Sequence, residues 1–231
     1  MVVSPPRRTA PVSTVEGRPV LPLTALRIAS GDLTLAGELR TPEGDGPFPA
    51  AVVCHPHPRM GGDMDNNVVL AAVDGLLKHG IAALRFNFRG SGESEGSHDD
   101  GNGEQDDVHA ALAHAASLPA LDAKRLGLAG YSFGAGMAAA AATEAIPALA
   151  LIALPLGMGR DPSETLAAYP NPMLLMAGDM DQFCEAGALE ELGGALGARA
   201  KTRIVDGADH FWLGFEREVS DGVGEFFAAQ L

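Results

Sequence analysis

The pattern of apolar and polar positions changes near residue 50 of the chain. Before that point, residues 24–42 form two short runs of strand-like alternation, with a turn at 30–32 between them. From residue 50 onward, short apolar runs alternate with segments in which apolar residues recur at helical spacing. A continuous apolar run such as 50–54 is typical of a strand that is buried on both faces of a sheet.

This alternation predicts the fold class. Apolar runs predict strands at 50–54, 81–88, 125–129, 148–154, 173–177 and 201–205. Helical spacing predicts helices at 66–79, 103–118, 133–143, 185–196 and 212–231. Strands that alternate with helices indicate an α/β fold, with a mostly parallel sheet flanked by helices on both faces. The two leading strands are expected to form an antiparallel N-terminal edge.

The domain organisation is expected to be simple. The Pro-rich residues 1–23 predict a flexible N-terminal tail, and residues 24–231 a single α/β domain. The insertion at 155–170 is too short to form a cap domain.

Charge and cysteine content narrow the range of partners. The net charge is −14, from 16 Lys and Arg against 30 Asp and Glu, which argues against binding to nucleic acid or to anionic membranes. The sequence shows neither a bilayer-spanning apolar stretch nor the apolar segment of a signal peptide. Two cysteines, Cys54 and Cys184, do not make a disulfide framework. We therefore expect a cytoplasmic protein, either a monomer or a homodimer.

One serine carries a strong catalytic signal. Residues 130–134 read G-x-S-x-G between an apolar strand and an alanine-rich helix, which predicts a nucleophile elbow that presents Ser132. The following helix N-terminus places a positive dipole end near a developing oxyanion. Residues 92–96 have the same spacing around Ser94, but no apolar helix follows them and two glutamates flank the serine. We interpret this second motif as a loop.

The chain order of a hydrolase triad then selects the partners of Ser132. In this fold the order is Ser, acid, His, and His210 is the only histidine beyond Ser132. It follows a predicted strand and is expected to be the general base. The acid should follow the strand at 173–177, where Asp179 and Asp181 compete. We favour Asp181, several residues into the loop, and expect Asp179 to brace that loop.

An oxyanion hole requires two backbone N–H groups. One is expected from Phe133, directly after the nucleophile. The other should come from the loop after the strand at 50–54, where prolines are excluded because they have no N–H; His57 is favoured, with Met60 as the second choice. The spacing His55-x-His57 lacks further ligands nearby, so neither a metal nor another cofactor is expected.

Five segments carry a family resemblance: HPHPRMGGDMDNNVV, LRFNFRGSGESEG, GYSFGAGMA, AGDMDQF and GADHFW. They resemble small bacterial α/β-superfamily serine hydrolases, lidless esterases similar to the dienelactone hydrolase group. The resemblance runs from about residue 24 to the end, and it implies an α/β-hydrolase fold without a cap domain. It also implies that Ser132 is the nucleophile, Asp181 the acid and His210 the base. True dienelactone hydrolases carry Cys at the nucleophile position, so the resemblance does not imply their activity.

These observations predict a serine hydrolase that cleaves small-molecule carboxylic esters with short to medium acyl chains through an acyl-enzyme. The same triad also serves amidases, peptidases and thioesterases, which stay open as alternatives. A non-catalytic binding module on the hydrolase fold is an alternative of another class. Four side chains are candidates either for an acyl pocket or for the core: Met158, Phe183, Phe211 and Trp212.

Overall fold

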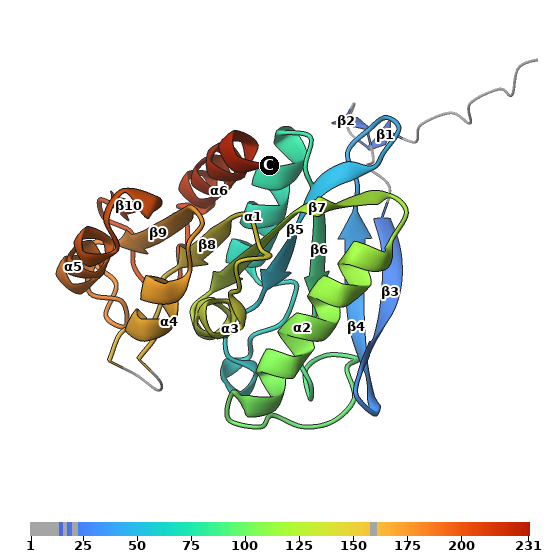
Figure 1. Cartoon of the computed structure of the whole chain (residues 1–231), viewed down its shortest axis with the longest axis horizontal. Coiled ribbons are helices and arrows are strands. Elements are labelled where there is room, and N and C mark those ends of the chain that lie inside the picture. Colours follow the sequence, from blue (N-terminus) through green and yellow to red (C-terminus); the bar gives the residue numbers. More distant parts are fainter. Residues whose placement is uncertain (1–13, 16–17, 20–22, 158–160) are drawn as a thin grey trace, which may run out of the picture.

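The structure is a computed structural model that describes residues 14–15, 18–19, 23–157 and 161–231 (Figure 1). Most of the predicted tail at 1–23 lies outside the described residues. Within it, β1 (Thr14–Val15) pairs with β2 (Arg18–Pro19) in antiparallel orientation. No helix in the described part of the chain is long and apolar enough to cross a membrane.

An eight-stranded sheet forms the centre of the molecule, in the order β10-β9-β8-β7-β5-β6-β4-β3. The strands from β10 to β6 run parallel to one another, and β4 and β3 are antiparallel at the other edge. The predicted fold class and its antiparallel N-terminal edge are therefore confirmed. The strands are β3 (Leu23–Ser30), β4 (Leu33–Arg40), β5 (Phe48–Cys54), β6 (Ala82–Phe86), β7 (Leu121–Tyr131), β8 (Leu149–Ile152), β9 (Met173–Gly178) and β10 (Ala200–Val205).

Helices cover both faces of this sheet (Figure 1). α1 packs against α6 on one face, while α2 packs against α3 on the other, where α4 contacts α3 and α5. The helices are α1 (Asn67–Lys78), α2 (Asn102–Ser117), α3 (Phe133–Ala141), α4 (Ser163–Ala168), α5 (Ala186–Leu196) and α6 (Glu216–Gln230), with short 3-10 turns η1 (Pro58–Met60) and η2 (Gly197–Arg199).

The apolar strands are buried between these two helical layers. Val52, Leu128, Leu151 and Leu175 lie on four adjacent strands, and each is fully buried. A strand covered on both faces needs apolar residues at every position, which explains why these runs do not alternate with polar residues. The sheet is therefore a rigid support for the loops that follow its strands.

Two helical predictions need correction. The last helix begins at Glu216 rather than at residue 212, because Trp212 adopts a φ of 58° and the Phe215 N–H donates to the Trp212 oxygen in a turn. The insertion at 155–170 contains α4, which was not expected. α4 has only six residues and only Leu166 among them is buried, so it leaves almost no helical pattern of apolar positions.

Candidate active site

The turn between β7 and α3 holds Ser132 in a strained conformation. Ser132 has φ 55° and ψ −120°, a backbone conformation that side-chain-bearing residues rarely adopt. Its N–H donates to the Ile152 oxygen at 2.9 Å, and its own oxygen accepts from the Ala135 N–H at 2.9 Å. Strain of this kind persists only where the surrounding structure fixes it, and here it lifts the hydroxyl above the carboxyl end of the sheet.

The two glycines of the motif are needed because backbone segments approach closely at the turn. A Cβ on Gly130 would overlap the Gly134 carbonyl oxygen, and a Cβ on Gly134 would overlap the Cys54 carbonyl oxygen. Both obstacles are backbone atoms, which do not swing aside as a flexible side chain does. The glycines therefore allow α3 to begin directly against the ends of β5 and β7.

Three side chains from separate strand ends form a continuous hydrogen-bonded chain. Ser132 Oγ lies 2.9 Å from His210 Nε2, and His210 Nδ1 lies 2.9 Å from both carboxylate oxygens of Asp181. Asp181 and His210 are 6% and 8% exposed, so water competes little for these contacts. The structure therefore brings together the three residues that the sequence singled out.

The Asp181 carboxylate is oriented by its own loop. Its Oδ1 accepts from the backbone N–H groups of Phe183 at 2.8 Å and Cys184 at 2.9 Å. The Oδ1 of Asp179 accepts from the Gly207 N–H at 2.7 Å and joins the loops after β9 and β10. The two aspartates that competed in the sequence thus make different contacts, and Asp181 is the one beside the imidazole.

His210 is held from both sides. The buried Tyr131 hydroxyl donates to the His210 carbonyl oxygen at 2.7 Å. Burial, together with the charges of Asp181 and a neighbouring aspartate, raises the pKa of Tyr131, so the hydroxyl stays protonated as a donor. The rings of Phe183 and Phe211 pack at centroid distances of 4.8 and 5.8 Å from the imidazole.

Two backbone N–H groups, those of Phe133 and His57, are the candidate oxyanion donors of this site. The Phe133 N–H is at the first position of α3, where no intrahelical acceptor exists, and the Phe133 and His57 rings lie 4.8 Å apart. Among the described hydrogen bonds, neither the Phe133 nor the His57 N–H has an acceptor. The Met60 N–H, the second choice, donates to the His57 oxygen at 3.0 Å and is already engaged.

The neighbouring histidine His55 has a structural role. It is fully buried, its Nδ1 donates to the Pro56 oxygen at 2.6 Å, and its Nε2 accepts from the Phe88 N–H at 3.0 Å. Burial lowers the pKa of His55 to about 4, so the ring is neutral. Both ring nitrogens are therefore unavailable to a metal, and the described residues contain no group of three or more metal-ligating side chains.

Ser94, in the second G-x-S-x-G motif, also has local partners. Its hydroxyl donates to the Asn87 oxygen at 2.6 Å and accepts from the Ala36 N–H at 2.9 Å. These contacts fasten the loop after β6 to strand β4. The motif is thus a structural loop that has the same spacing as the elbow.

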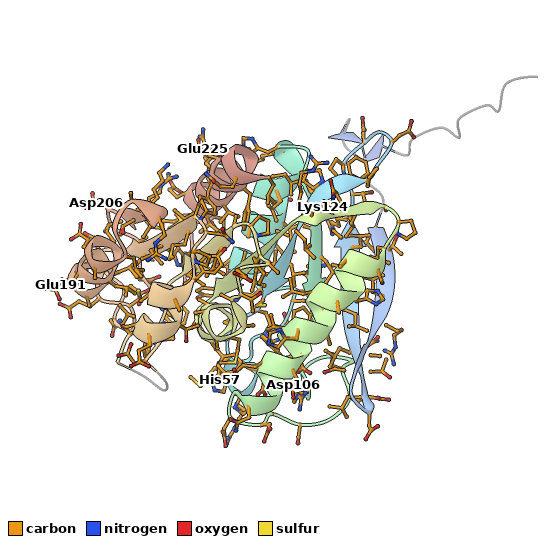
Figure 2. The ribbon with its side chains drawn as sticks, viewed as in Figure 1. His57, Asp106, Lys124, Glu191, Asp206 and Glu225 are labelled. Carbon is orange, nitrogen blue, oxygen red and sulfur yellow. The ribbon has the colours of Figure 1, made fainter. Side chains whose placement is uncertain are left out.

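The sequence reasoning missed one wall of the site, which is formed by His98 and the start of α2. The His98 ring lies 4.7 Å from the His57 ring and 5.6 Å from the Phe133 ring, and its Nδ1 is 2.7 Å from the buried Glu104 carboxylate. Figure 2 labels His57, which lies beside the N-terminal end of α2. Glu104 also accepts from the Gly101 N–H at 2.9 Å, as a glutamate in the first turn of a helix often does. The position of Glu104 in the first turn of a predicted helix was the one feature of the sequence that pointed to this wall.

A cavity of about 610 Å³ surrounds these groups, here called the main cavity. Phe183 and Phe211, which were candidates for an acyl pocket or for the core, line this cavity, whereas Trp212 is fully buried in the core. Met158 lies outside the described residues. The lining residues come from the loops after β5, β6, β7, β8, β9 and β10: Pro56, His57, Met60, Gly61, Gly62, Asn66, His98, Asp100, Tyr131, Ser132, Phe133, Pro155, Phe183, His210 and Phe211.

Solved structures of bacterial hydrolases share this architecture. An α/β serine hydrolase homologue from Coxiella burnetii superposes with a TM-score of 0.78 at 28% identity, covering 87% of this chain and 96% of that chain. The protein XC6422 from Xanthomonas campestris, described as an α/β serine hydrolase without a lid, gives a TM-score of 0.75 at 30% identity, with 90% and 95% coverage. The chain is therefore similar to lidless α/β serine hydrolases along nearly its whole length.

Sequence comparison agrees with the structural one. The uncharacterized protein RP471 of Rickettsia prowazekii is 32% identical over 186 residues, which cover 77% of this chain and 78% of that protein. Residues 31–175, well over half of the chain, match the family described as X-Pro dipeptidyl-peptidase (S15 family). With its fold and these matches, the chain is a hydrolase of the α/β-hydrolase superfamily and belongs to the S15 family.

Proposed function

We propose that the protein is a carboxylic-ester hydrolase that cleaves small-molecule esters with short to medium acyl chains through an acyl-enzyme. The observation that carries this proposal is the hydrogen-bonded chain Ser132–His210–Asp181, which opens from a strained elbow into the main cavity. The described residues form no cap over it, which suits substrates of varied shape.

The first step is the attack of Ser132 Oγ on the carbonyl carbon of the ester. The proton of the hydroxyl passes to His210 Nε2, 2.9 Å away. This transfer requires the imidazole proton to reside on Nδ1, and the Asp181 carboxylate keeps it there by accepting from Nδ1. The same carboxylate stabilises the imidazolium that forms.

The tetrahedral intermediate carries a negative charge on the former carbonyl oxygen. The N–H groups of Phe133 and His57 are the donors that we assign to this oxygen. The His57 N–H is fixed by the prolines on either side of it, and the Phe133 N–H by its place at the start of α3. Little backbone reorganisation therefore accompanies the development of the negative charge. The N-terminal end of α3 adds a favourable dipole.

The remaining steps use the same groups in reverse. His210 returns the proton from Nε2 to the leaving alcohol oxygen, the bond between carbon and oxygen breaks, and the acyl group stays on Ser132. A water molecule then attacks the acyl carbon while His210 accepts its proton. His210 finally protonates Ser132 Oγ, which releases the carboxylic acid.

A peptidase is the second candidate, because the S15 family is described as X-Pro dipeptidyl-peptidase. The same groups would then protonate an amine leaving group instead of an alcohol. Hydrolysis of Ala-Pro-p-nitroanilide compared with p-nitrophenyl esters separates the two. An ester hydrolase gives a kcat/KM for the anilide that is smaller by several orders of magnitude, whereas a dipeptidyl-peptidase releases p-nitroaniline readily.

The direct test is an assay of the purified protein on p-nitrophenyl esters from acetate to palmitate, with Ser132→Ala beside it. Removal of the nucleophile is expected to lower kcat by about 10⁴ or more. Ser94→Ala is the matched control, since it changes the serine of the second motif, and it should retain turnover. Equal rates for wild type and Ser132→Ala would reject the proposal, and absence of labelling by a fluorophosphonate would favour a non-catalytic binding module.

A cytoplasmic location and a monomeric or homodimeric state stay predictions. Cys54 and Cys184 are both free and buried, which suits a reducing compartment. Burial raises the pKa of Cys184 to about 12, so its thiol is unreactive and takes no part in the proposed chemistry.

A further inference from the structure

A second cavity adjoins the main one on the far side of Phe133, and it is here called the side cavity. It has a volume of about 180 Å³. It shares Asp100, Phe133 and Pro155 with the main cavity, so these three residues lie between the two cavities. The rest of its wall comes from α2, α3, α4 and the loop after β8: Gly101, Asn102, Gln105, Gly136, Met137, Ala140, Leu154, Asp161, Pro162 and Thr165.

Gly136 keeps this space open. A Cβ built on Gly136 meets no atom within 4 Å, although the residue lies in the first turns of α3 beside Ser132. Helical side chains point back toward the N-terminus of their helix. A side chain at 136 would therefore extend over Phe133, where the side cavity meets the main one. Glycine in a helix destabilises it relative to alanine, and the local structure gives no steric reason for its presence.

The side cavity lies on the acyl side of the proposed reaction. The leaving oxygen must face His210 Nε2, which protonates it, and the rings packed on His210 include those of Phe183 and Phe211. None of these three residues lines the side cavity, whereas all three line the main cavity. The leaving group is thus directed along the two phenylalanines, and the acyl group toward Phe133 and Gly136.

We propose that the side cavity is an acyl subsite for a compact, uncharged ring or branched hydrocarbon group, and that Gly136 sets its size. The inference rests on the proposed hydrolase function. Cavities of roughly 150 Å³ accommodate benzene, so 180 Å³ suffices for one six-membered ring. Asp100 and Asp161 lie on its wall and repel a carboxylated acyl group.

The test compares p-nitrophenyl acetate with p-nitrophenyl cyclohexanecarboxylate in wild type and Gly136→Leu. We expect kcat/KM for the ring ester to fall at least about 30-fold relative to acetate, because single methylene groups in apolar pockets already change kcat/KM by about 10-fold or more. Gly136→Ala should give a smaller loss in the same direction. Gly194→Leu is the matched control, since Gly194 is an exposed glycine of α5 that also has open space at its Cβ.

An equal change in kcat/KM for both esters in Gly136→Leu, or no change for either, would overturn the subsite. Turnover of p-nitrophenyl acetate that depends on Ser132 would still support the proposed function. If wild type cleaves neither ester, the proposed function fails, and binding of cyclohexanecarboxamide followed by ligand-observed NMR tests the cavity by itself. The subsite requires weaker binding to Gly136→Leu by at least about threefold and unchanged binding to Gly194→Leu. Equal binding to both variants would reject it.

Discussion

Replacing Asp181 with asparagine tests whether the Asp181 carboxylate keeps the imidazole proton on His210 Nδ1. Asp181 Oδ1 accepts from the Phe183 and Cys184 N–H groups, so the oxygen of an asparagine is retained at that position. The amide nitrogen must then occupy the place of Oδ2, 2.9 Å from His210 Nδ1. Two N–H groups repel each other at that distance, so the amide favours the imidazole tautomer with its proton on Nε2, although the retained oxygen also lies 2.9 Å from Nδ1.

This change of tautomer removes the general base. With the proton on Nε2, His210 donates toward Ser132 Oγ and cannot accept from it. An asparagine at the equivalent place in a serine protease triad lowers kcat by about 10⁴, and the geometry here predicts a similar factor. That factor corresponds to about 5.5 kcal/mol in the activation free energy. Because the Asp181→Asn variant would keep two backbone hydrogen bonds, its free energy of unfolding should fall by only about 1–2 kcal/mol.

The measurement is the initial rate of p-nitrophenyl acetate hydrolysis under saturating conditions, with thermal unfolding followed in parallel. Asp179→Asn is the matched control, because its amide oxygen can still accept from the Gly207 N–H. It should lower kcat by less than about 10-fold. A loss below about 10-fold in a folded Asp181→Asn, or a larger loss in Asp179→Asn, would refute the assignment of Asp181 as the triad acid.

Three further predictions concern stability. The pKa of His55 is lowered to about 4 in the folded state, so the unfolded chain binds an extra proton between pH 6.5 and 4. The free energy of unfolding should therefore fall by up to about 3 kcal/mol as the pH is lowered through that window. The urea midpoint of His55→Asn should depend less on pH than that of wild type. Gly134→Ala should lower the free energy of unfolding by about 3 kcal/mol and abolish activity, because the added Cβ would overlap backbone atoms. Gly194→Ala, where the added Cβ meets open space, should raise the free energy of unfolding by about 0.5–1 kcal/mol. Similar urea midpoints for the two variants would contradict the steric account. Tyr131→Phe should destabilise by about 1–2 kcal/mol, since it leaves the buried carbonyl of His210 without its donor, and an unchanged denaturation midpoint would argue against that bond.

Much of the fold follows from the sequence because a parallel sheet leaves a simple signature. Strands such as β5 and β9 are apolar at nearly every position, and the helices between them keep an apolar face. Helix α4 was missed because it has only six residues and one buried side chain, too few for a helical pattern. The start of α6 was misplaced because it depends on a tertiary contact, the burial of Trp212 in the core, rather than on local periodicity.

The three residues of the hydrogen-bonded chain were predictable because each follows a strand. Carboxyl ends of parallel strands meet at one edge, so Ser132, Asp181 and His210 converge although they are far apart in the sequence. The same rule could not choose between Asp179 and Asp181. That choice depends on which carboxylate the loop turns toward the imidazole, and the N–H groups of Phe183 and Cys184 decide it.

The residues that form the walls around these three are placed by tertiary packing rather than by their position after a strand. His98 reaches the site because Glu104, buried in α2, lies beside its ring, and Gly136 matters because nothing else fills the space above it. Neither residue is a position of the G-x-S-x-G motif, so the rule for strand ends assigns them no role, although Gly136 lies within the segment GYSFGAGMA. In the proposed reaction, the catalytic groups therefore come from the strand ends, whereas the proposed subsite makes acyl selectivity depend on helices α2, α3 and α4. Substitutions at Gly136 should consequently change which ester is cleaved while leaving the reaction itself intact.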